Sequence, residues 1–168
     1  MCGIFGFQTT LQNVTRAKTL TKILLKISQE RGREASGISI KTCDINEIFK
    51  KPVKGEKLYK LNHFDNIFKN LKSRIGEKNT LLSIIGQCRL TTNGRAYIDS
   101  FNQPVFDSQI SLVHNGIILN IDDLIKKYLK NKVKNDEIAS QSDSWLLCKL
   151  INHFFLKNNN HLINFNKI

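Results

Sequence analysis

The order of apolar patterns along this 168-residue chain predicts one domain of the α+β or layered α/β type. Continuous apolar runs of strand length occur in both halves of the chain, and other stretches repeat apolar residues at helical spacing. Hydrophobic residues make up 40% of the sequence, which is enough for a real core, while the length is too short for two ordinary domains. We therefore expect residues 1–168 to form a single mixed domain.

The first half of the chain alternates predicted strands and helices. Residues 3–8 read as a short apolar strand, and apolar side chains at helical spacing predict a helix over 15–29. The alternating stretch 36–42 predicts a half-buried strand. Residues 43–80 mix lysines with turn residues, and in that region only 62–73 predicts a helix.

The second half begins with the apolar run 81–88, a candidate buried strand, and 109–114 is another. Asn120 is a good helix-capping residue, and the apolar stripe that follows it predicts a short helix. A second helix is expected from about Ser142, before the chain ends in an asparagine-rich tail.

The chain is strongly basic, with 26 Lys and Arg against 14 Asp and Glu and a formal net charge of +12. Such a charge would suit an acidic partner, for example a nucleic acid, a sugar phosphate or an acidic protein. The lysines are dispersed, however, and aromatic residues stand beside them only occasionally, which argues against a nucleic-acid surface. No apolar run approaches the roughly 20 residues of a membrane span, and no signal-peptide pattern opens the chain. We expect a soluble, cytoplasmic protein without a membrane partner.

Four cysteines lie far apart, at positions 2, 43, 88 and 148, and none belongs to a CxxC pair. This spacing indicates neither a zinc ribbon nor a small disulfide framework. We interpret Cys43, Cys88 and Cys148 as reduced core or strand residues, and we expect no metal site and no cofactor.

Cys2, in the opening MCGIFGF, is the most informative residue of the chain. If Met1 is removed, Cys2 carries both a thiol and a free α-amine, so that nucleophile and general base lie on one residue. The α-amine titrates near about pH 8 and the thiol near about 8.5, so a proton can pass between them at neutral pH. A small buried side chain on a first strand explains the same residue, and the position alone leaves both interpretations open.

Four further stretches combine unusual polar residues: RGREASGISI at 31–40, GQCRLTTNG at 86–94, LVHNGIILN at 112–120 and SQSDSWLL at 140–147. Arg89 could grip a carboxylate or simply lie on the surface. Asn115 and Gly116 could form an oxyanion hole or a hairpin turn. Asp143 could pair with an ammonium group, or it could stabilise the N-terminus of a helix that Ser142 caps.

Taken together and in this order, the motifs resemble the glutaminase domain of class II glutamine amidotransferases, which use an N-terminal cysteine nucleophile. The resemblance runs from Cys2 to about residue 150. MCGIFGF is similar to the family opening, RGREASGI to its RG(x)xSG segment, and NQPV at 102–105 to its loop before the HNG strand. The forms GQCRLTTNG and VHNGII resemble the glucosamine-6-phosphate synthase branch more than asparagine synthetase.

The resemblance implies an αββα sandwich of the N-terminal-nucleophile hydrolase type, incomplete at its C-terminal end. It also implies that L-glutamine is hydrolysed to L-glutamate and ammonia through a thioester on Cys2. In that reaction Asn115 and Gly116 would form the oxyanion hole.

The resemblance further implies how glutamine is bound. Arg89 would hold the α-carboxylate of glutamine, and Asp143 would pair with its α-ammonium group. Thr92 and Asn93 would contact glutamine from the loop that follows Arg89. Asn93 stands where this branch usually has histidine, and Leu90 stands where it usually has tryptophan.

The family domain continues into further strands and then into a synthase domain that uses the ammonia, whereas this chain ends at Ile168. We therefore expect a C-terminally shortened glutaminase domain. Its partner would be an ammonia-accepting synthase or isomerase domain, supplied in trans or lost by truncation, with a sugar phosphate or another molecule as acceptor.

Other classes of function remain open. A catalytically silent glutaminase-like module could dock a synthase partner through the basic surface. A small nucleic-acid-binding protein is motivated only by the net charge of +12. A papain-like enzyme would use Cys88 and His114, but the residues that flank them give it no support.

Overall fold

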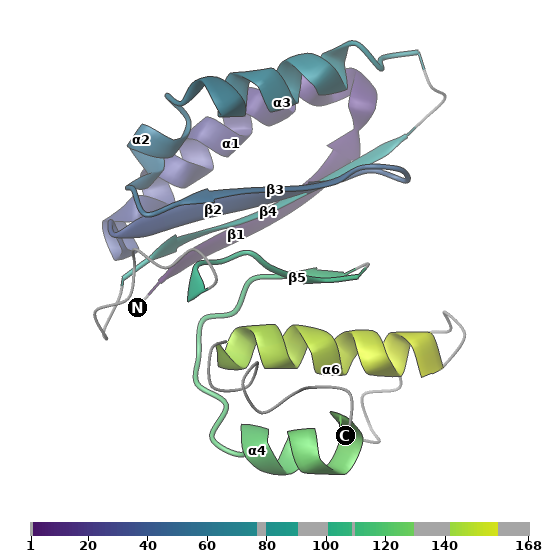
Figure 1. Ribbon diagram of the computed structural model, residues 1–168. Coiled ribbons are helices and arrows are strands. Elements are labelled where there is room, and N and C mark those ends of the chain that lie inside the picture. Colours follow the sequence, from purple (N-terminus) through teal and green to yellow (C-terminus); the bar gives the residue numbers. More distant parts are fainter. Residues whose placement is uncertain (1, 77–79, 91–100, 109, 130–141, 158–168) are drawn as a thin grey trace. The chain divides into compact units, whose positions relative to one another are not determined.

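The computed structural model describes residues 2–76, 80–90, 101–108, 110–129 and 142–157. These residues fall into two compact units. The first consists of Met1–Pro104 with Val113–Asn115, and the second of Val105–Leu112 with Gly116–Ile168. Each unit combines strands with helices (Figure 1), so the α+β class is confirmed. That the two units form one domain stays a prediction.

The first unit contains a four-stranded antiparallel sheet in the order β1-β4-β2-β3. Its strands are β1 (Gly3–Thr10), β2 (Ala35–Lys41), β3 (Asn46–Lys51) and β4 (Leu81–Arg89). The strands predicted at 3–8, 36–42 and 81–88 are confirmed. β1 pairs with β4 over its whole length, and Gly3 lies opposite Cys88. This register places the N-terminus of β1 beside the C-terminal end of β4.

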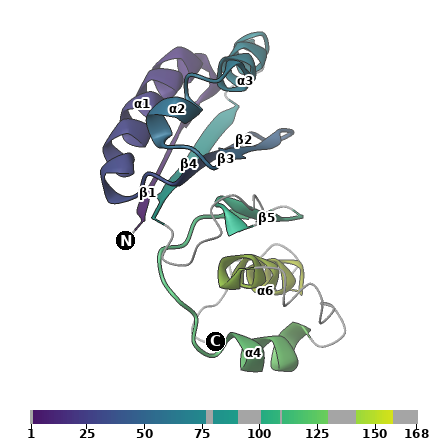
Figure 2. The same ribbon diagram turned by 60° about the vertical axis from the view of Figure 1, so that its left-hand side comes forward.

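Three helices cover one face of this sheet (Figures 1 and 2): α1 (Val14–Ser28), α2 (Gly55–Leu58) and α3 (Asn62–Lys72). The helices predicted over 15–29 and 62–73 are thus confirmed, whereas α2 and β3 were not predicted. The core between helices and sheet includes Leu25, Phe64 and Ile84, which have no exposed surface. Burial of each such side chain stabilises the fold by about 1.5–3 kcal/mol. This core fixes the sheet whose end carries the site residues.

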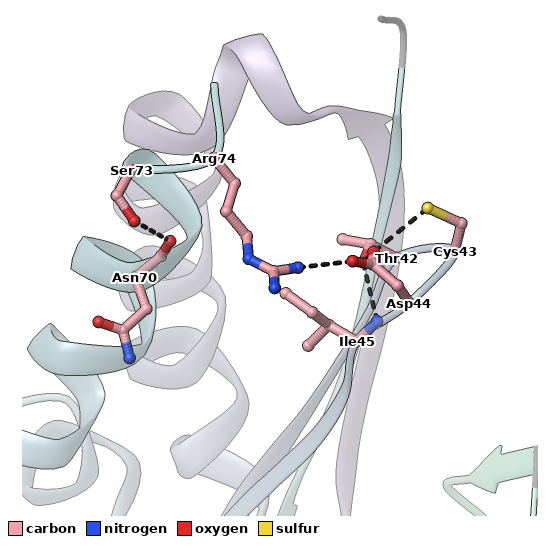
Figure 3. A network of polar contacts seen from close by, with 7 residues as sticks. All are labelled: Thr42, Cys43, Asp44, Ile45, Asn70, Ser73 and Arg74. Atoms are coloured by element: carbon pink, nitrogen blue, oxygen red, sulfur yellow. Dashed lines mark hydrogen bonds and ion pairs between the residues drawn. The ribbon is translucent and has the colours of Figure 1, made fainter. Parts of the chain in front are cut away.

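The turn between β2 and β3 is held by a network of polar contacts (Figure 3). Asp44 Oδ1 accepts hydrogen bonds from the Thr42 hydroxyl at 2.9 Å and from the Cys43 thiol at 3.2 Å. Arg74, which follows α3, reaches across and donates to Asp44 Oδ2 at 2.6 Å. The network therefore ties the end of the helical layer to the sheet. Cys43 is exposed in this turn, so its predicted place in the core or a strand was wrong.

Replacement of Asp44 by asparagine should lower the melting temperature slightly at neutral pH, and this effect should shrink as the pH approaches 2. Hydrogen bonds from Cys43, then from Thr42 and Arg74, lower the pKa of Asp44 to about 2 from its ordinary value of 3.8. Because the folded pKa is the lower one, the stabilisation is present above the unfolded pKa of about 4 and is lost as the pH falls through the folded pKa. Thermal unfolding at several pH values between 2 and 7 measures this. A melting-temperature difference that stayed constant over that range would contradict the prediction.

The second unit pairs a small hairpin with helices. β5 (Val105–Asp107) and β6 (Ile110–Leu112) are antiparallel, so the predicted strand at 109–114 is confirmed over Ile110–Leu112, while residue 109 lies outside the described residues. α4 (Ile121–Leu124) continues into a π-helical turn, Ile125–Leu129. The long helix α6 (Asp143–Lys157) confirms the helix expected from about Ser142.

α6 contacts different partners on two sides. Leu146 and Leu150 pack with Ile125 and Leu129, the buried residues that follow α4. On the other side the Cys148 thiol donates to the Ile110 carbonyl oxygen at 3.3 Å. The hairpin and α4 therefore both rest on α6.

Local details differ from two expectations in this unit. Asn120 precedes α4, but its side chain makes no capping hydrogen bond. Asn115 and Gly116 do not form a hairpin turn, because β6 ends at Leu112 and the next described element is α4. None of the helices within the described ranges is long and apolar enough to span a bilayer.

Candidate active site

Cys2 directly precedes β1 and is partly exposed. Its Sγ lies 3.9 Å from the carbonyl oxygen of Leu90, the residue that follows β4. The antiparallel pairing of β1 with β4 produces this proximity, since it aligns the first residues of the chain with the last residues of β4. The thiol therefore lies at the same end of the sheet as Arg89.

Asn115 holds the main chain of Cys2 through both ends of its side-chain amide. Its Oδ1 accepts a hydrogen bond from the Cys2 N–H, and its Nδ2 donates one to the Cys2 carbonyl oxygen, each at 3.3 Å. A main-chain donor and acceptor on the same residue also fix which way the amide faces. The structure thus brings together two predicted catalytic residues that are 113 positions apart in sequence.

Arg89 is the last residue of β4 and is half-buried. Its Nη1 donates to the Phe101 carbonyl oxygen at 2.6 Å and to Asn102 Oδ1 at 3.2 Å. Among the described residues, no carboxylate forms an ion pair with Arg89. A guanidinium has five N–H groups, and these contacts use Nη1 alone.

The RGREASGI segment packs against the end of β4. A Cβ on Gly32 would lie 2.3 Å from the Arg89 carbonyl carbon and 2.4 Å from the Leu90 nitrogen, both main-chain atoms. The Glu34 N–H donates to the Arg89 carbonyl oxygen at 3.1 Å. A residue without a side chain is therefore needed at position 32, because the main chain at the end of β4 lies too close for a Cβ. The sequence had suggested only that Gly32 ends a helix.

The sequence interpretation missed Gln87 and Gln103, which bind the main chain next to Asn115. Gln87 is 1% exposed, and its Nε2 donates to Gln103 Oε1 and to the His114 carbonyl oxygen, each at 2.9 Å. Gln103 accepts from the His114 N–H and donates to the His114 carbonyl oxygen at 3.0 Å. Both glutamines lie in motifs that the sequence singled out, GQCR and NQPV. Gln87 could have been recognised from the sequence, because it is a polar residue near the end of a largely apolar strand.

Asp143 and Gly116 belong to the second unit. Asp143 begins α6, where its Oδ1 accepts from the Ser144 N–H at 2.7 Å and its Oδ2 from the Ile118 N–H at 3.1 Å. The Ser142 hydroxyl accepts from the Trp145 N–H at 3.3 Å, as expected of a helix cap. Asp143 therefore has the structural role at a helix N-terminus that the sequence allowed. Its role toward an ammonium group stays a prediction.

The predicted glutamine contacts Thr92 and Asn93 lie outside the described residues. Within the described ranges, no group of three or more His, Cys, Asp or Glu side chains is arranged to hold a metal ion.

The buried cysteines are poor candidates for a nucleophile. Burial, with a smaller contribution from Cys2, raises the pKa of Cys88 to about 12, and its thiol donates to the Leu25 carbonyl oxygen. Burial likewise raises the pKa of Cys148 to about 11. Because the thiolate is the reactive form, the papain-like alternative that relies on Cys88 is disfavoured.

No protein-family model matches the chain. Comparison with curated proteins finds the glutamine–fructose-6-phosphate aminotransferase (isomerizing) of Lactiplantibacillus plantarum, 28% identical over 161 residues, which covers 94% of this chain and 23% of the relative. The protein of that name from Helicobacter pylori is 30% identical over 154 residues, with 90% of this chain and 22% of the relative covered. The one from Staphylococcus epidermidis is 28% identical over 155 residues, with 92% and 22% covered.

The chain spans less than a quarter of the length of these curated relatives. The similarity nevertheless extends over at least nine-tenths of this chain, so it includes the central motifs around Arg89 and Asn115. The chain is therefore related to the class II glutamine amidotransferase domain of the glucosamine-6-phosphate synthase branch, as its motifs indicate.

Proposed function

We propose that this chain is a glutaminase domain that hydrolyses L-glutamine to L-glutamate and ammonia, with Cys2 as the nucleophile once Met1 is removed. The pair of hydrogen bonds between Asn115 and the main chain of Cys2 carries the proposal. It joins the predicted nucleophile to the predicted oxyanion-binding motif. Relatedness to glutamine–fructose-6-phosphate aminotransferases supports glutamine as the substrate.

The α-amine of Cys2 acts as the general base in this mechanism. The nitrogen that becomes this amine already donates to Asn115 Oδ1, so the bond would hold the amine in a fixed orientation. The amine takes the thiol proton directly or through one water, and the thiolate then attacks the side-chain carbonyl carbon of glutamine. A C–S bond forms while the carbonyl electron pair moves onto oxygen.

Asn115 and Gly116 stabilise the negative oxygen of the resulting tetrahedral intermediate. The Asn115 amide has two N–H groups, of which one binds the Cys2 carbonyl oxygen and the other can face the oxyanion. Loss of one such donor typically lowers the rate by about 10²- to 10³-fold. The C–N bond then breaks, ammonia leaves with the proton held by the amine, and water hydrolyses the thioester to glutamate.

Arg89 binds the α-carboxylate of glutamine in this proposal. Its Nη1 is anchored to the loop at residues 101–102, which leaves Nε and Nη2 as an edge for two parallel hydrogen bonds. Asp143 pairs with the α-ammonium group, and Thr92 and Asn93 contact glutamine from the loop after Arg89. A carboxylate offers about four acceptor sites, so the hydrogen bonds that Asp143 accepts from the Ile118 N–H and from the N–H and hydroxyl of Ser144 are compatible with one further partner.

The αββα sandwich is the arrangement that we propose for the whole domain. The first unit is a sheet with helices on one face, and the second is a hairpin that rests on α6. A sandwich of this type has two central β layers between two helical layers, and each unit contains strands and helices that could contribute to it. The ammonia would pass to a sugar phosphate or another acceptor on a synthase or isomerase domain outside these 168 residues, because the relatives are more than four times as long.

Incubation of the purified chain with L-glutamine tests the proposal, provided that intact-mass measurement shows the loss of Met1. Glutamate and ammonia should appear in equal amounts. Glutamine that binds without turnover would instead indicate a silent binding module, and a preparation that neither binds nor hydrolyses glutamine would overturn the proposed function.

A further inference from the structure

The loop that carries Gln103 is held at several points by the sheet. Lys50 of β3 donates through Nζ to the carbonyl oxygens of Asn102 at 2.6 Å and Pro104 at 3.2 Å, one on each side of Gln103. A Cβ on Gly37 of β2 would lie 2.3 Å from the Gln103 carbonyl oxygen. The main chain at Gln103 is thus pressed against β2 and anchored to β3.

The side chain of Gln103 pairs with both main-chain groups of His114, much as an adjacent strand would pair with them. Gln87 of β4 donates to Gln103 Oε1 and to the His114 carbonyl oxygen, so it fixes the orientation of the Gln103 amide. Among the described residues, β6 ends at Leu112, two positions before this contact. The side-chain amides of Gln87 and Gln103 therefore hold the main chain at His114, beyond the last main-chain hydrogen bonds of β6.

Asn115 follows His114 directly and holds the N–H and the carbonyl oxygen of Cys2. Lys50 thus holds the main chain on both sides of Gln103, and hydrogen bonds lead from Gln87 and Gln103 to the main chain of His114. The peptide bond then joins His114 to Asn115, which binds the candidate nucleophile. We propose that Gln103 is a positioning residue that sets Asn115 against Cys2. This inference rests on the proposed glutaminase function, in which Asn115 acts directly on the reacting atoms.

Gln103→Met tests the proposal, because it keeps the length of the side chain and removes both hydrogen bonds to His114, together with the acceptor for Gln87 Nε2. The matched control is Gln8→Met, which removes an exposed hydrogen bond to Ser83 on the same sheet. For Gln103→Met we expect kcat to fall by about 10- to 100-fold while KM changes by less than about 3-fold, since the misplaced group acts in the transition state. Gln103→Glu keeps the acceptor for the His114 N–H and loses the donor, so its kcat should be intermediate.

Two measurements report on the geometry without glutamine. Hydrogen exchange of the His114 amide should accelerate in Gln103→Met and stay unchanged in Gln8→Met. The rate at which iodoacetamide alkylates Cys2, separated from exposed Cys43 by peptide mapping, should also differ between these two variants.

A folded Gln103→Met protein with the kcat of the Gln8→Met control and unchanged His114 exchange would overturn the inference. If Gln103→Met does not fold, the same two measurements are made on Gln103→Glu, and a kcat and a His114 exchange rate equal to those of the Gln8→Met control would overturn the inference. If the unmodified chain hydrolyses no glutamine, the proposed function fails. Hydrogen exchange of the His114 amide and alkylation of Cys2 then test, without any activity measurement, whether Gln103 positions Asn115. In that case a difference from Gln8→Met supports the inference, and no difference overturns it.

Discussion

Cys2→Ala should release no measurable glutamate from glutamine, a loss of at least about 10⁴-fold in kcat. The substitution removes the only atom in the proposed mechanism that forms a covalent bond to the substrate, and removal of such a nucleophile abolishes nearly all acceleration. A coupled assay for glutamate measures the effect. Because Cys2 is partly exposed beside β1 and outside the described core, the fold should survive, as a circular dichroism spectrum would show.

Cys43→Ala is the matched control for this substitution. Cys43 is exposed in the turn between β2 and β3, where its thiol donates to Asp44 Oδ1. Its activity should equal that of the unmodified chain. Glutaminase activity retained by Cys2→Ala would contradict the mechanism, as would full activity of a chain that keeps Met1, because its Cys2 nitrogen would be an amide without basic character.

Gly32→Ala should destabilise the chain by about 2 to 3 kcal/mol and lower kcat/KM as well. A Cβ at this position would lie 2.3 Å from the Arg89 carbonyl carbon and 2.4 Å from the Leu90 nitrogen. These atoms belong to the main chain, so a rotamer change cannot relieve the clash. The end of β4 would have to move, and the guanidinium of Arg89 and the carbonyl oxygen beside the Cys2 thiol would move with it.

Urea denaturation and steady-state kinetics measure the two effects of Gly32→Ala. Gly6→Ala is the control, since the nearest atom to its Cβ would be the Ile85 Cγ2 methyl group, at 3.2 Å, and the Ile84 carbonyl oxygen would lie at an ordinary contact distance of 3.6 Å. Its effect should stay below about 1 kcal/mol, because a side chain can shift by a few tenths of an ångström. Equal stability losses in both variants would show that Gly32 has no special steric role.

The sequence predicted the elements whose apolar period is regular. The run 81–88 corresponds to β4, whose side chains alternate between buried and less buried over most of its length. The helical spacing at 15–29 corresponds to α1, but Leu20, Ile23 and Ile27 of that stretch are exposed, and the buried residues of α1 include Thr21 and Ser28. The spacing therefore predicted the helix without predicting which of its faces is buried. β3 was missed because it is an edge strand with the sequence NEIFKK, and edge strands carry charged residues that interrupt the pattern. β5 has only three residues after Pro104, which is too short for any period to show.

The candidate site was predictable in part for a different reason. Resemblance to a family pointed to Cys2, Arg89 and Asn115, and the structure brings Asn115 to Cys2 and places Arg89 at the same end of the sheet. Periodicity alone could not have indicated the contact, because pairing between distant residues leaves no local pattern. Gln87 and Gln103 were missed since they bind each other and the main chain of His114, and main-chain groups, which every residue carries, leave no mark in the sequence.

The hydrogen bonds between Cys2 and Asn115 also impose an order on synthesis. Asn115 is made 113 residues after Cys2, which at roughly 5–20 residues per second corresponds to about 6–23 s of translation. During this interval nothing from the HNG segment can hold the N-terminus, so an aminopeptidase can reach Met1. After Asn115 has closed on Cys2, the same end of the chain is held at its main-chain nitrogen. We therefore expect Met1 to be removed faster from the growing chain than from the completed one.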